Sequence, residues 1–565
     1  MRSSRALRLL CTRSTIPRRS GRAPLKPAVI RNGYCSVCET ATSRGKTAKS
    51  TTNLPILPAD HRQLGIEQEL FTTSVYSPGS TIFLPNGTKI FNSLTRFLRS
   101  QYEHFGFEEV ITPTIYKKSL WEKSGHWENY AEDMYSVTGR GAEAAKEDRQ
   151  IGEDEEYGLK PMNCPGHCLI FASKQRSYRD LPIRYADFSP LHRNEISGAL
   201  SGLTRVRRFH QDDGHIFCRP SQIRQEISKT LEFVRLTYNV LGLGPYRLAL
   251  STRPADHFIG MVEEWDNAEA ALKESLDASG QTWTINEGDG AFYGPKIDII
   301  LKDSDGKEHQ TATIQLDFQL PKRFELEYQA PAPEVEMKGL TTDDPSLLAV
   351  QGPVTPVLIH RAVLGSVERI MALLIEHYNG HWPFWLNPRQ VMIVTVSDDA
   401  AVVEYARKVR DEIQGYQPAD SQSSLGGIMP LRAGLTHSHN ISIDIDESAR
   451  PLKKKLSEAK RKRYGIIAVV GKRNVETQHL EVDFTAIPTS RYNVGNSALL
   501  NIIARSTGTK GKESISAVGG QHIKSLDDGL GGEQPLRLSP DQLKNISISP
   551  KSLRRFLAEL QTCYV

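Results

Sequence analysis

The chain of 565 residues is long enough for two or three domains, each with its own core. No stretch carries the roughly 18 consecutive apolar residues that a membrane span needs, and the seven cysteines are scattered, which fits a reducing compartment rather than a disulfide framework. Residues 1–38 hold eight arginines, one lysine and no acidic residue, so the formal net charge of +5 becomes mildly negative without them.

This first segment is rich in arginine and serine and poor in acids, which is the composition of a mitochondrial transit peptide. We therefore expect residues 1–50 to be a transit peptide or a disordered segment, and the protein to act in the mitochondrial matrix. A disordered basic arm that touches nucleic acid is the alternative. The remaining chain is mildly acidic, so its contacts with nucleic acid must come from local basic patches.

Helical and strand periodicities alternate between residues 51 and 386, which predicts a mostly antiparallel sheet with flanking helices. The charged run 139–156 is predicted to be a surface insertion. The predicted helices lie at 91–98, 223–234, 272–276 and 367–378. The predicted strands lie at 107–115, where Pro113 breaks the strand, and at 183–188, 207–209, 297–302 and 311–318.

After Pro388 short strands alternate with helices, which predicts a smaller α/β domain. Glycine and serine are frequent in residues 506–540, which are expected to be a low-complexity insertion. The expected strands lie at 391–396, 441–445 and 466–470, and the expected helices at 402–413, 451–463 and 552–560.

The most informative stretch is residues 192–218, which concentrates arginines, acids and two possible metal ligands. Strand-like runs on either side of a Ser/Gly-rich turn at 197–202 predict an antiparallel hairpin that carries Arg193 and Arg205. Guanidinium groups match phosphate oxygens in pairs, so this hairpin could bind a polyanionic ligand. A surface hairpin with solvated charges is the alternative.

The same stretch resembles motif 2 of class II aminoacyl-tRNA synthetases, and its ending, Gln-Asp-Asp-Gly-His-Ile-Phe-Cys, resembles the threonyl-tRNA synthetases. Further matches follow in order between about residues 60 and 485, and the last one resembles motif 3. They are residues 124–130, 160–167, 291–298, 313–318 and 359–369.

The resemblance implies an α+β fold with a class II catalytic domain at 51–386 and an anticodon-binding domain at 387–565. It also implies a homodimer in which motif 1, around Pro113, builds the subunit interface. Because the catalytic matches begin near Asp60, we expect the mitochondrial type without an N-terminal editing domain. Such an enzyme should form some Ser-tRNA, since serine lacks only one methyl group of threonine.

The resemblance further implies that Cys164, His215 and His360 hold one zinc ion. A thiolate and two neutral imidazoles bind Zn2+ while leaving coordination positions open for a substrate. The amino and hydroxyl groups of threonine fit those positions, whereas valine lacks the hydroxyl. Without the resemblance, an unlinked cysteine and two histidines would more often be core or surface residues. The residues implied to contact threonine are Gln211, Asp213, Tyr293 and Gln310.

An ATP site with Mg2+ beside the pyrophosphate is implied as well. Arg193 would bridge the amino-acid carboxylate and the α-phosphate, while Arg205 and Arg369 would hold the terminal phosphates. Glu195 would bind the adenine amino group and Phe209 would stack on the ring. Gln315 is also implied to contact ATP. Two further matches complete the catalytic list with Arg193 and Arg369: His126, near the terminal ribose of the tRNA, and Lys296, near substrate or phosphate.

Together these matches predict an enzyme that activates L-threonine with ATP and transfers it to threonine tRNA for mitochondrial translation. Another class II synthetase, seryl or prolyl, would not need the three zinc ligands together. A non-catalytic nucleic-acid-binding paralogue should have lost Arg193 or Arg369. The basic run at 453–463 could bind tRNA phosphates, although a solvated helix face is the usual explanation of such a run.

Overall fold

The computed structural model describes residues 59–138, 156–303, 306–415, 441–487, 543–562 and 564. The expected transit segment at 1–50, most of the surface insertion at 139–156 and the low-complexity insertion at 506–540 lie outside these residues. Within them, none of the helices combines the length and the hydropathy that crossing a membrane requires. Two sheets, each with its own buried apolar core, organise the described chain.

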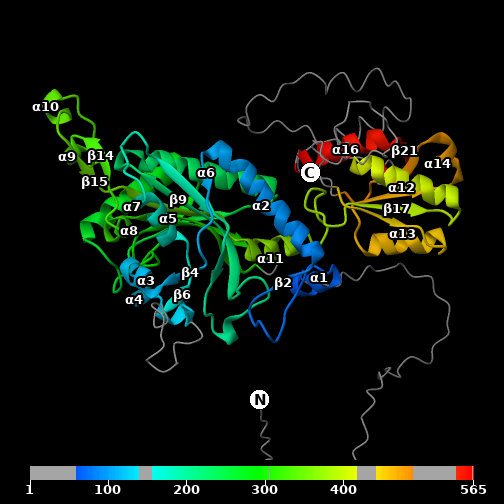
Figure 1. Cartoon of the computed structure of the whole chain (residues 1–565), viewed down its shortest axis with the longest axis horizontal. Coiled ribbons are helices and arrows are strands. Elements are labelled where there is room, and N and C mark those ends of the chain that lie inside the picture. The colour runs from blue at the N-terminus through cyan, green and yellow to red at the C-terminus, as the bar shows by residue number, and fades with distance from the viewer. Residues whose placement is uncertain are drawn as a thin grey trace, which may run out of the picture. The chain divides into compact units, whose positions relative to one another are not determined.

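The larger sheet, which contains the strand labelled β9 in Figure 1, has nine strands in the described residues. Their order is β11-β10-β12-β13-β16-β9-β7-β3, with β8 paired to β9. All neighbours are antiparallel except β10 with β11 and β3 with β7, which confirms the predicted sheet type. The strands are β3 (Glu108–Glu109), β7 (Ile183–Asp187), β8 (Pro190–His192), β9 (Arg208–Cys218), β10 (Arg247–Ser251), β11 (Trp283–Asn286), β12 (Lys296–Lys302), β13 (Glu308–Asp317) and β16 (Val357–Ser366).

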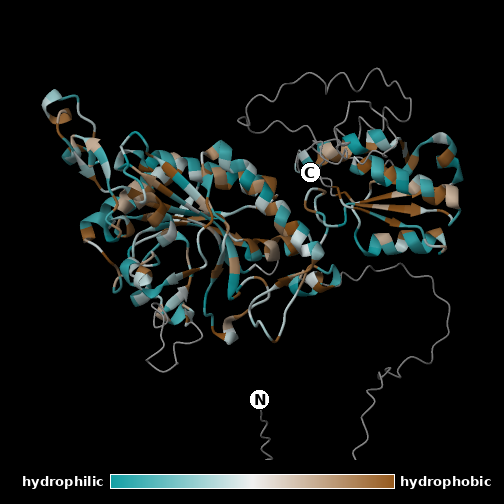
Figure 2. Ribbon diagram, in the orientation of Figure 1, coloured by the Kyte–Doolittle hydropathy of each residue, from teal (hydrophilic) through white to brown (hydrophobic). Residues whose placement is uncertain are grey.

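Helices pack their apolar faces against this sheet, whose central strands are strongly hydrophobic in Figure 2. The predicted helix at 91–98 is part of α2 (Pro85–Phe105), which starts with a proline in its first turn and ends at Gly106, where φ is 72°. The other long helices are α6 (Ile223–Val240), α7 (Val262–Ala278) and α11 (Val367–His377). All four predicted helices of this part of the chain are therefore confirmed.

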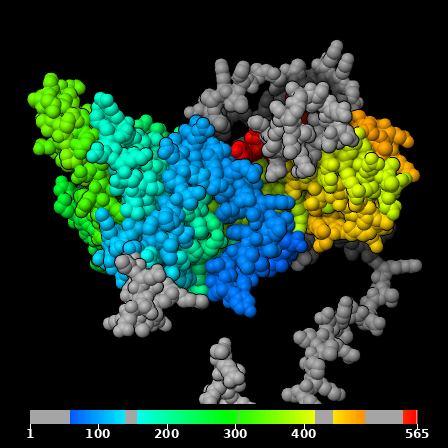
Figure 3. Space-filling model, in the orientation of Figure 1, coloured from blue at the N-terminus to red at the C-terminus, as the bar shows by residue number. Residues whose placement is uncertain are grey.

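Shorter elements surround the sheet and complete its edges. The short helices are α1 (His61–Glu67), α3 (Lys118–Ser124), α4 (His126–Asn129), α5 (Cys164–Ala172), α8 (Gln319–Arg323), α9 (Pro333–Glu336) and α10 (Pro345–Leu348). The short strands are β1 (Phe71–Thr72), β2 (Ile82–Phe83), β4 (Ile115–Lys117), β5 (Ser136–Val137), β6 (Tyr157–Leu159), β14 (Tyr328–Pro331) and β15 (Gln351–Val354). In Figure 3 the blue segment that holds α1 and α2 lies on the visible surface.

The predicted strand at 107–115 is wrong in its extent. Only Glu108 and Glu109 pair with the large sheet, and the chain resumes pairing at Ile115 in a different, three-stranded sheet. Pro113 lies between the two pairings and has no backbone N–H to continue a ladder. The segment therefore leaves one sheet and enters another.

The second part of the chain is an α/β unit, as the alternating pattern predicts. Its five-stranded sheet has the order β18-β17-β19-β20-β21, in which β17 is parallel to both β18 and β19. The strands are β17 (Val391–Thr395), β18 (Ile443–Asp446), β19 (Ile466–Val470), β20 (Leu480–Asp483) and β21 (Ile546–Ile548). The helices are α12 (Ala400–Gln414), α13 (Leu452–Arg461), α14 (Lys472–Thr477) and α16 (Pro550–Thr562).

One lysine of the basic run does not lie on a solvated face. Lys455 in α13 is 1% exposed, and its Nζ donates to the backbone oxygen of Thr395 at 2.8 Å and to that of Asp446 at 3.2 Å. Lys455 thus fixes α13 to the ends of β17 and β18 and is unavailable to a phosphate.

A buried ion pair joins β9 to β16 in the core of the large sheet. Arg361 is 1% exposed, and its Nη1 donates to Asp212 Oδ2 at 2.7 Å. The guanidinium carbon lies 4.2 Å from the ring centre of Phe107, and the rings of Tyr102 and Phe233 are 5.2 Å away. Gly214 faces Arg361 across the strands, and a Cβ there would lie 2.4 Å from Arg361 Nε, so only glycine leaves room for the guanidinium group.

Candidate functional site

A cavity of about 290 Å3 opens on the large sheet where β9, β13 and β16 run side by side. Side chains alternate across a strand, so every second residue of β9 points into this cavity. The lining includes every predicted site residue except His126 and Lys296: Cys164, Arg193, Glu195, Arg205, Phe209, Gln211, Asp213, His215, Tyr293, Gln310, Gln315, His360 and Arg369.

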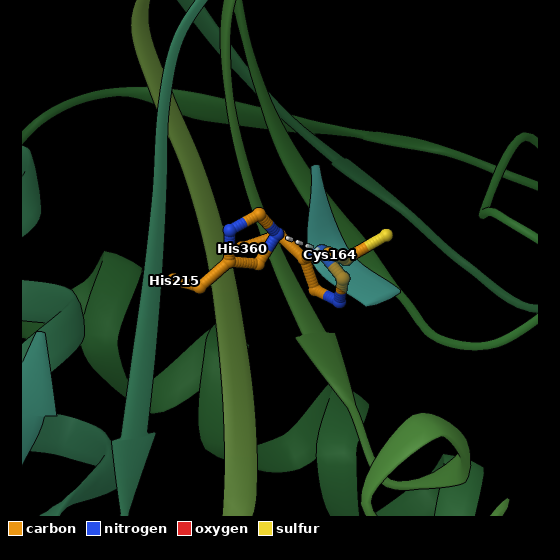
Figure 4. A group of neighbouring side chains, drawn as sticks. All are labelled: Cys164, His215 and His360. Atoms are coloured by element: carbon orange, nitrogen blue, oxygen red, sulfur yellow. Dashed lines mark hydrogen bonds between the residues drawn. The ribbon is translucent and has the colours of Figure 1, made fainter. Parts of the chain in front are cut away.

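Strand register brings the two histidines of the predicted zinc site together. His360 on β16 pairs with His215 on β9, and their Nδ1 and Nε2 atoms are 3.0 Å apart (Figure 4). Cys164 enters from the first residue of α5, and the three ligand atoms lie within 4.8 Å of one another. All three side chains are buried. One thiol and two imidazoles are a donor set that suits a zinc ion with open positions.

Two buried groups that the sequence did not single out orient these histidines. His360 Nε2 lies 2.8 Å from Asp317 Oδ2, and His215 Nδ1 lies 2.8 Å from His167 Nδ1. Both partners are completely buried. A histidine whose second nitrogen donates to a fixed acceptor presents its first nitrogen in one tautomer and one orientation, as metal-binding histidines require. The signal was available in part, because His167 and Asp317 lie within the matching segments 160–167 and 313–318.

The two predicted residues outside the lining are held by other contacts. His126 is 1% exposed, with Nδ1 2.8 Å from Ser124 Oγ and Nε2 3.7 Å from Cys164 Sγ, so it lies behind the cysteine. Burial lowers the pKa of His126 to about 3, and the imidazole is neutral. Lys296 Nζ lies between Asp298 Oδ2 at 3.1 Å and Asp289 Oδ2 at 3.3 Å.

The residues predicted to contact threonine differ in how free their polar atoms are. Asp213 Oδ2 accepts from Asn163 Nδ2 at 3.1 Å, while its Oδ1 faces His215 Nε2 at 4.0 Å. The Tyr293 hydroxyl donates to Gln315 Oε1 at 2.8 Å. The amide of Gln310 donates to Asp298, which turns it toward the rim of the cavity.

Three arginines that line the same cavity lie near one another. Arg205 pairs with Glu195 at 2.7 Å, and Arg369 donates to the backbone oxygens of Thr204 and Gln310 at 3.2 and 3.0 Å. In the described residues Arg193 has no ion-pair partner, and its guanidinium carbon lies 5.1 Å from the ring centre of Phe209. Burial lowers the pKa of Arg369, and the nearby charges of Arg193 and Arg205 lower it further. Positive charge thus exceeds negative charge here, which favours an anionic ligand.

Comparisons with known proteins agree with this arrangement. Residues 146–340 match the family model of the class II tRNA synthetase core domain (G, H, P, S and T), and residues 390–486 match that of the anticodon binding domain. The chain is 48% identical over 452 residues to a probable mitochondrial threonine-tRNA ligase of Schizosaccharomyces pombe, covering 79% of this chain and 86% of that protein. It is 47% identical over 426 residues to the mitochondrial threonine-tRNA ligase of Saccharomyces cerevisiae, with coverages of 74% and 84%.

Cytoplasmic threonine-tRNA ligases match at a similar level, as in Dictyostelium discoideum and Saccharomyces cerevisiae, both at 46% identity. Among solved structures, the RNA binding domain of a threonyl-tRNA synthetase from Cryptosporidium parvum aligns with a TM-score of 0.63 and 43% identity. That alignment covers 75% of this chain and 92% of the solved one.

Proposed function

Because the chain belongs to the threonyl-tRNA synthetase family, we propose that it is a threonine-tRNA ligase that activates L-threonine with ATP and Mg2+ and transfers it to threonine tRNA. The observation that carries the proposal is one cavity that is lined both by Cys164, His215 and His360 and by Arg193, Arg205 and Arg369. The first group suits an amino acid with a vicinal hydroxyl, and the second suits phosphates. ATP–pyrophosphate exchange run across the amino acids tests it: threonine should support strong exchange, serine weak exchange and valine none.

The threonine half of the cavity would hold a zinc ion on Cys164, His215 and His360. When bound, the zinc would supply open coordination positions for the amino and hydroxyl groups of the substrate. Asp213, on the same strand face as His215, accepts a hydrogen bond from the threonine hydroxyl. Gln211 and Tyr293 hold the amino group, and Gln315 fixes the Tyr293 hydroxyl at 2.8 Å.

In the ATP half, Arg193 contacts the amino-acid carboxylate and the α-phosphate. It stabilises the negative charge that grows on the phosphoryl oxygens as the carboxylate attacks in line. Arg205 and Arg369 bind the terminal phosphates, Glu195 binds the adenine amino group, and Phe209 stacks on the ring. Arg205 must exchange its ion pair with Glu195 for the phosphates when ATP binds.

For the transfer step, His126 is the candidate catalytic side chain near the ribose hydroxyl. Because burial lowers the pKa of its imidazole to about 3, it would accept a hydrogen bond from that hydroxyl rather than take up its proton at neutral pH. Its 1% exposure means that the ribose reaches it only after the side chains in front of it move. Lys296 is assigned to the substrate side of the cavity, where a phosphate would compete with Asp289 and Asp298 for its ammonium group.

The proposal also includes the domain boundaries and the location of the protein in the cell. The catalytic domain spans about 51–386 and the anticodon-binding domain 387–565, in line with the separate apolar cores of the two sheets. The basic composition of residues 1–38 and the match to mitochondrial relatives support action in the mitochondrial matrix.

Replacing Cys164 with serine is expected to remove both zinc and threonine-dependent exchange, because a serine hydroxyl is a poor substitute for a thiolate ligand. Elemental analysis of protein purified without added metal should find one zinc per chain in the wild type and little in Cys164→Ser. Cys168→Ser is the matched control, since Cys168 is equally buried on α5 and lies outside the ligand group. The zinc assignment is wrong if Cys164→Ser keeps both zinc and threonine activation.

We also infer a homodimer that buries motif 1. Ile111 is 89% exposed and Ile115 is 42% exposed, on either side of Pro113, and a large exposed aliphatic side chain is typical of an interface. Ile111→Asp should convert the dimer to a monomer with reduced activity, as measured by light scattering and exchange at the same concentration. Lys273→Asp, at an exposed polar position on α7 outside motif 1, should leave the dimer unchanged. An active monomeric wild type would contradict the inference.

A further inference from the structure

His61 connects α11, which carries Arg369, to the loop that carries Arg205, although these segments are far apart in the sequence. Its Nδ1 lies 2.7 Å from Glu376 Oε1 on α11, 315 residues away. The backbone N–H of Leu203, in the loop between β8 and β9, donates to His61 Nε2 at 3.2 Å, 142 residues away. His61 itself is 5% exposed at the start of α1, whose capping residue is Asp60.

The two partners define the tautomer of His61. A backbone N–H can only donate, so Nε2 must be the acceptor and the proton must sit on Nδ1. The Nδ1–H then donates to the Glu376 carboxylate, which also accepts from the His61 backbone N–H at 3.2 Å. A neutral imidazole thus makes two directed bonds, one to each segment.

The Leu203 bond fixes the tip of a tight turn. Ser201 and Arg205 pair across this turn, with Ser201 N–H donating to Arg205 O at 3.1 Å. At the tip, Gly202 has a φ of 46°, and a Cβ there would lie 2.1 Å from His61 Nε2, so the backbone approaches the imidazole as closely as glycine allows. The Leu203 side chain is fully buried in the core.

Glu376, the other partner of His61, lies on the same helix, α11, as Arg369. Glu376 is two turns along α11 from Arg369, and Arg369 Nε donates to the backbone oxygen of Thr204, the residue between Leu203 and Arg205, at 3.2 Å. His61 and Arg369 therefore tie the same turn to the same helix at two points. The turn positions Arg205, and the helix positions Arg369.

We propose that His61 is a positioning residue for adenylation, which sets the turn of Arg205 against α11 so that Arg205 and Arg369 reach one polyphosphate. The assignment rests on the proposed function of the cavity. His61 does not line the cavity and touches no reacting atom. Its loss should therefore weaken the use of ATP and leave threonine binding unchanged.

Two variants separate positioning from simple anchoring of α1. The amide of Asn superimposes on Nδ1 of histidine, so His61→Asn keeps the donor to Glu376 and loses the acceptor for Leu203. The amide of Gln reaches the position of Nε2, so His61→Gln keeps the acceptor for Leu203 and loses the donor to Glu376. If His61 acts by positioning the turn, His61→Asn should be impaired and His61→Gln should be largely active.

For His61→Asn we expect a fall of about 10- to 100-fold in kcat/KM for ATP in pyrophosphate exchange, with KM for threonine within about threefold of wild type. Hydrogen exchange at Leu203 should accelerate in His61→Asn and stay slow in His61→Gln. Gln63→Ala, an exposed position on the same helix, should match wild type in both measurements.

The proposal is overturned if Asn and Gln variants are equally impaired, if Gln alone is impaired, or if neither differs from wild type. It is also overturned if KM for threonine rises as much as KM for ATP, since the effect would then not be specific to the use of ATP. Failure of the wild type to support threonine-dependent exchange would refute the proposed function, while hydrogen exchange would still report whether His61 holds Leu203.

Discussion

Replacing Arg193 with alanine is expected to lower the rate of threonine-dependent ATP–pyrophosphate exchange by about 100- to 1,000-fold, the loss typical of one preorganised charge donor in a transition state. The side chain lines the cavity without an ion-pair partner among the described residues, and its structural contact is the ring of Phe209. Its removal breaks no bond that holds the fold. The thermal unfolding of the variant should therefore stay close to that of the wild type.

Arg369→Ala should lower exchange by a similar factor. The segments around Thr204 and Gln310 should also become less ordered, because the Arg369 side chain donates to the backbone oxygens of both residues. Arg193→Lys should recover only part of the rate, since an ammonium group keeps the charge and lacks the planar pair of donors. Arg235→Ala, at an exposed position on α6, is the control for removing a guanidinium group. Near-normal exchange in Arg193→Ala or Arg369→Ala would refute the assignment of the ATP half.

Breaking the buried ion pair is expected to have the largest effect on stability. Arg361→Ala should lower the free energy of unfolding by about 3–5 kcal/mol, because it leaves Asp212 buried without its cation. Burial raises the pKa of Asp212 to about 6 even though the opposite charge of Arg361 and two backbone N–H donors lower it, and the carboxylate is still ionised at pH 7.5. Urea denaturation at that pH measures the loss.

Two control variants test whether burial of the ion pair causes this loss of stability. Arg247 and Glu308 form an ion pair of similar length, 3.0 Å, but their side chains are 42% and 45% exposed, so Arg247→Ala should cost less than about 1 kcal/mol. The double variant Asp212→Asn with Arg361→Met should be more stable than Arg361→Ala, since it removes both charges together. Equal losses for the buried and the exposed pair would contradict the role given to burial.

The sequence predicted the fold well wherever apolar residues repeat with a clear period. The apolar stripe of α2 follows from burial of one helix face, and the continuous apolar runs of β17 and β19 follow from burial of both strand faces, so both patterns are visible in the sequence. The segment 107–115 is not one strand because its residues belong to two sheets. Pro113 marks the break in the sequence, but the sequence does not show that the chain then enters a different sheet.

The helical period could also have corrected the interpretation of the basic run at 453–463 as a solvated or phosphate-binding face. Leu452, Lys455, Leu456 and Ala459 are spaced as one face of a helix, and all four pack inward in α13. A lysine on that face needs acceptors, and Lys455 finds them at the ends of two strands. Helical position, rather than charge alone, therefore identifies Lys455 as the buried residue of the basic run.

The candidate site required more than the sequence contains. The resemblance supplied residue identities, but the contact of Asp317 with His360 follows from the pairing of Gln315 with His360 across β13 and β16. The connection made by His61 spans 142 residues on one side and 315 on the other. Such contacts depend on tertiary packing, and neither local propensity nor periodicity encodes them.

Strand β9 also sets a limit on how the length of this chain can change. Its odd-numbered residues from 209 to 215 face the cavity, while Asp212, Gly214 and Ile216 face the core. Inserting or deleting a single residue would exchange the two faces, placing the carboxylate of Asp212 in the cavity and His215 in the apolar interior. Relatives that share the activity should therefore vary in length only in the connecting loops, and β9 should be identical in length in every active relative.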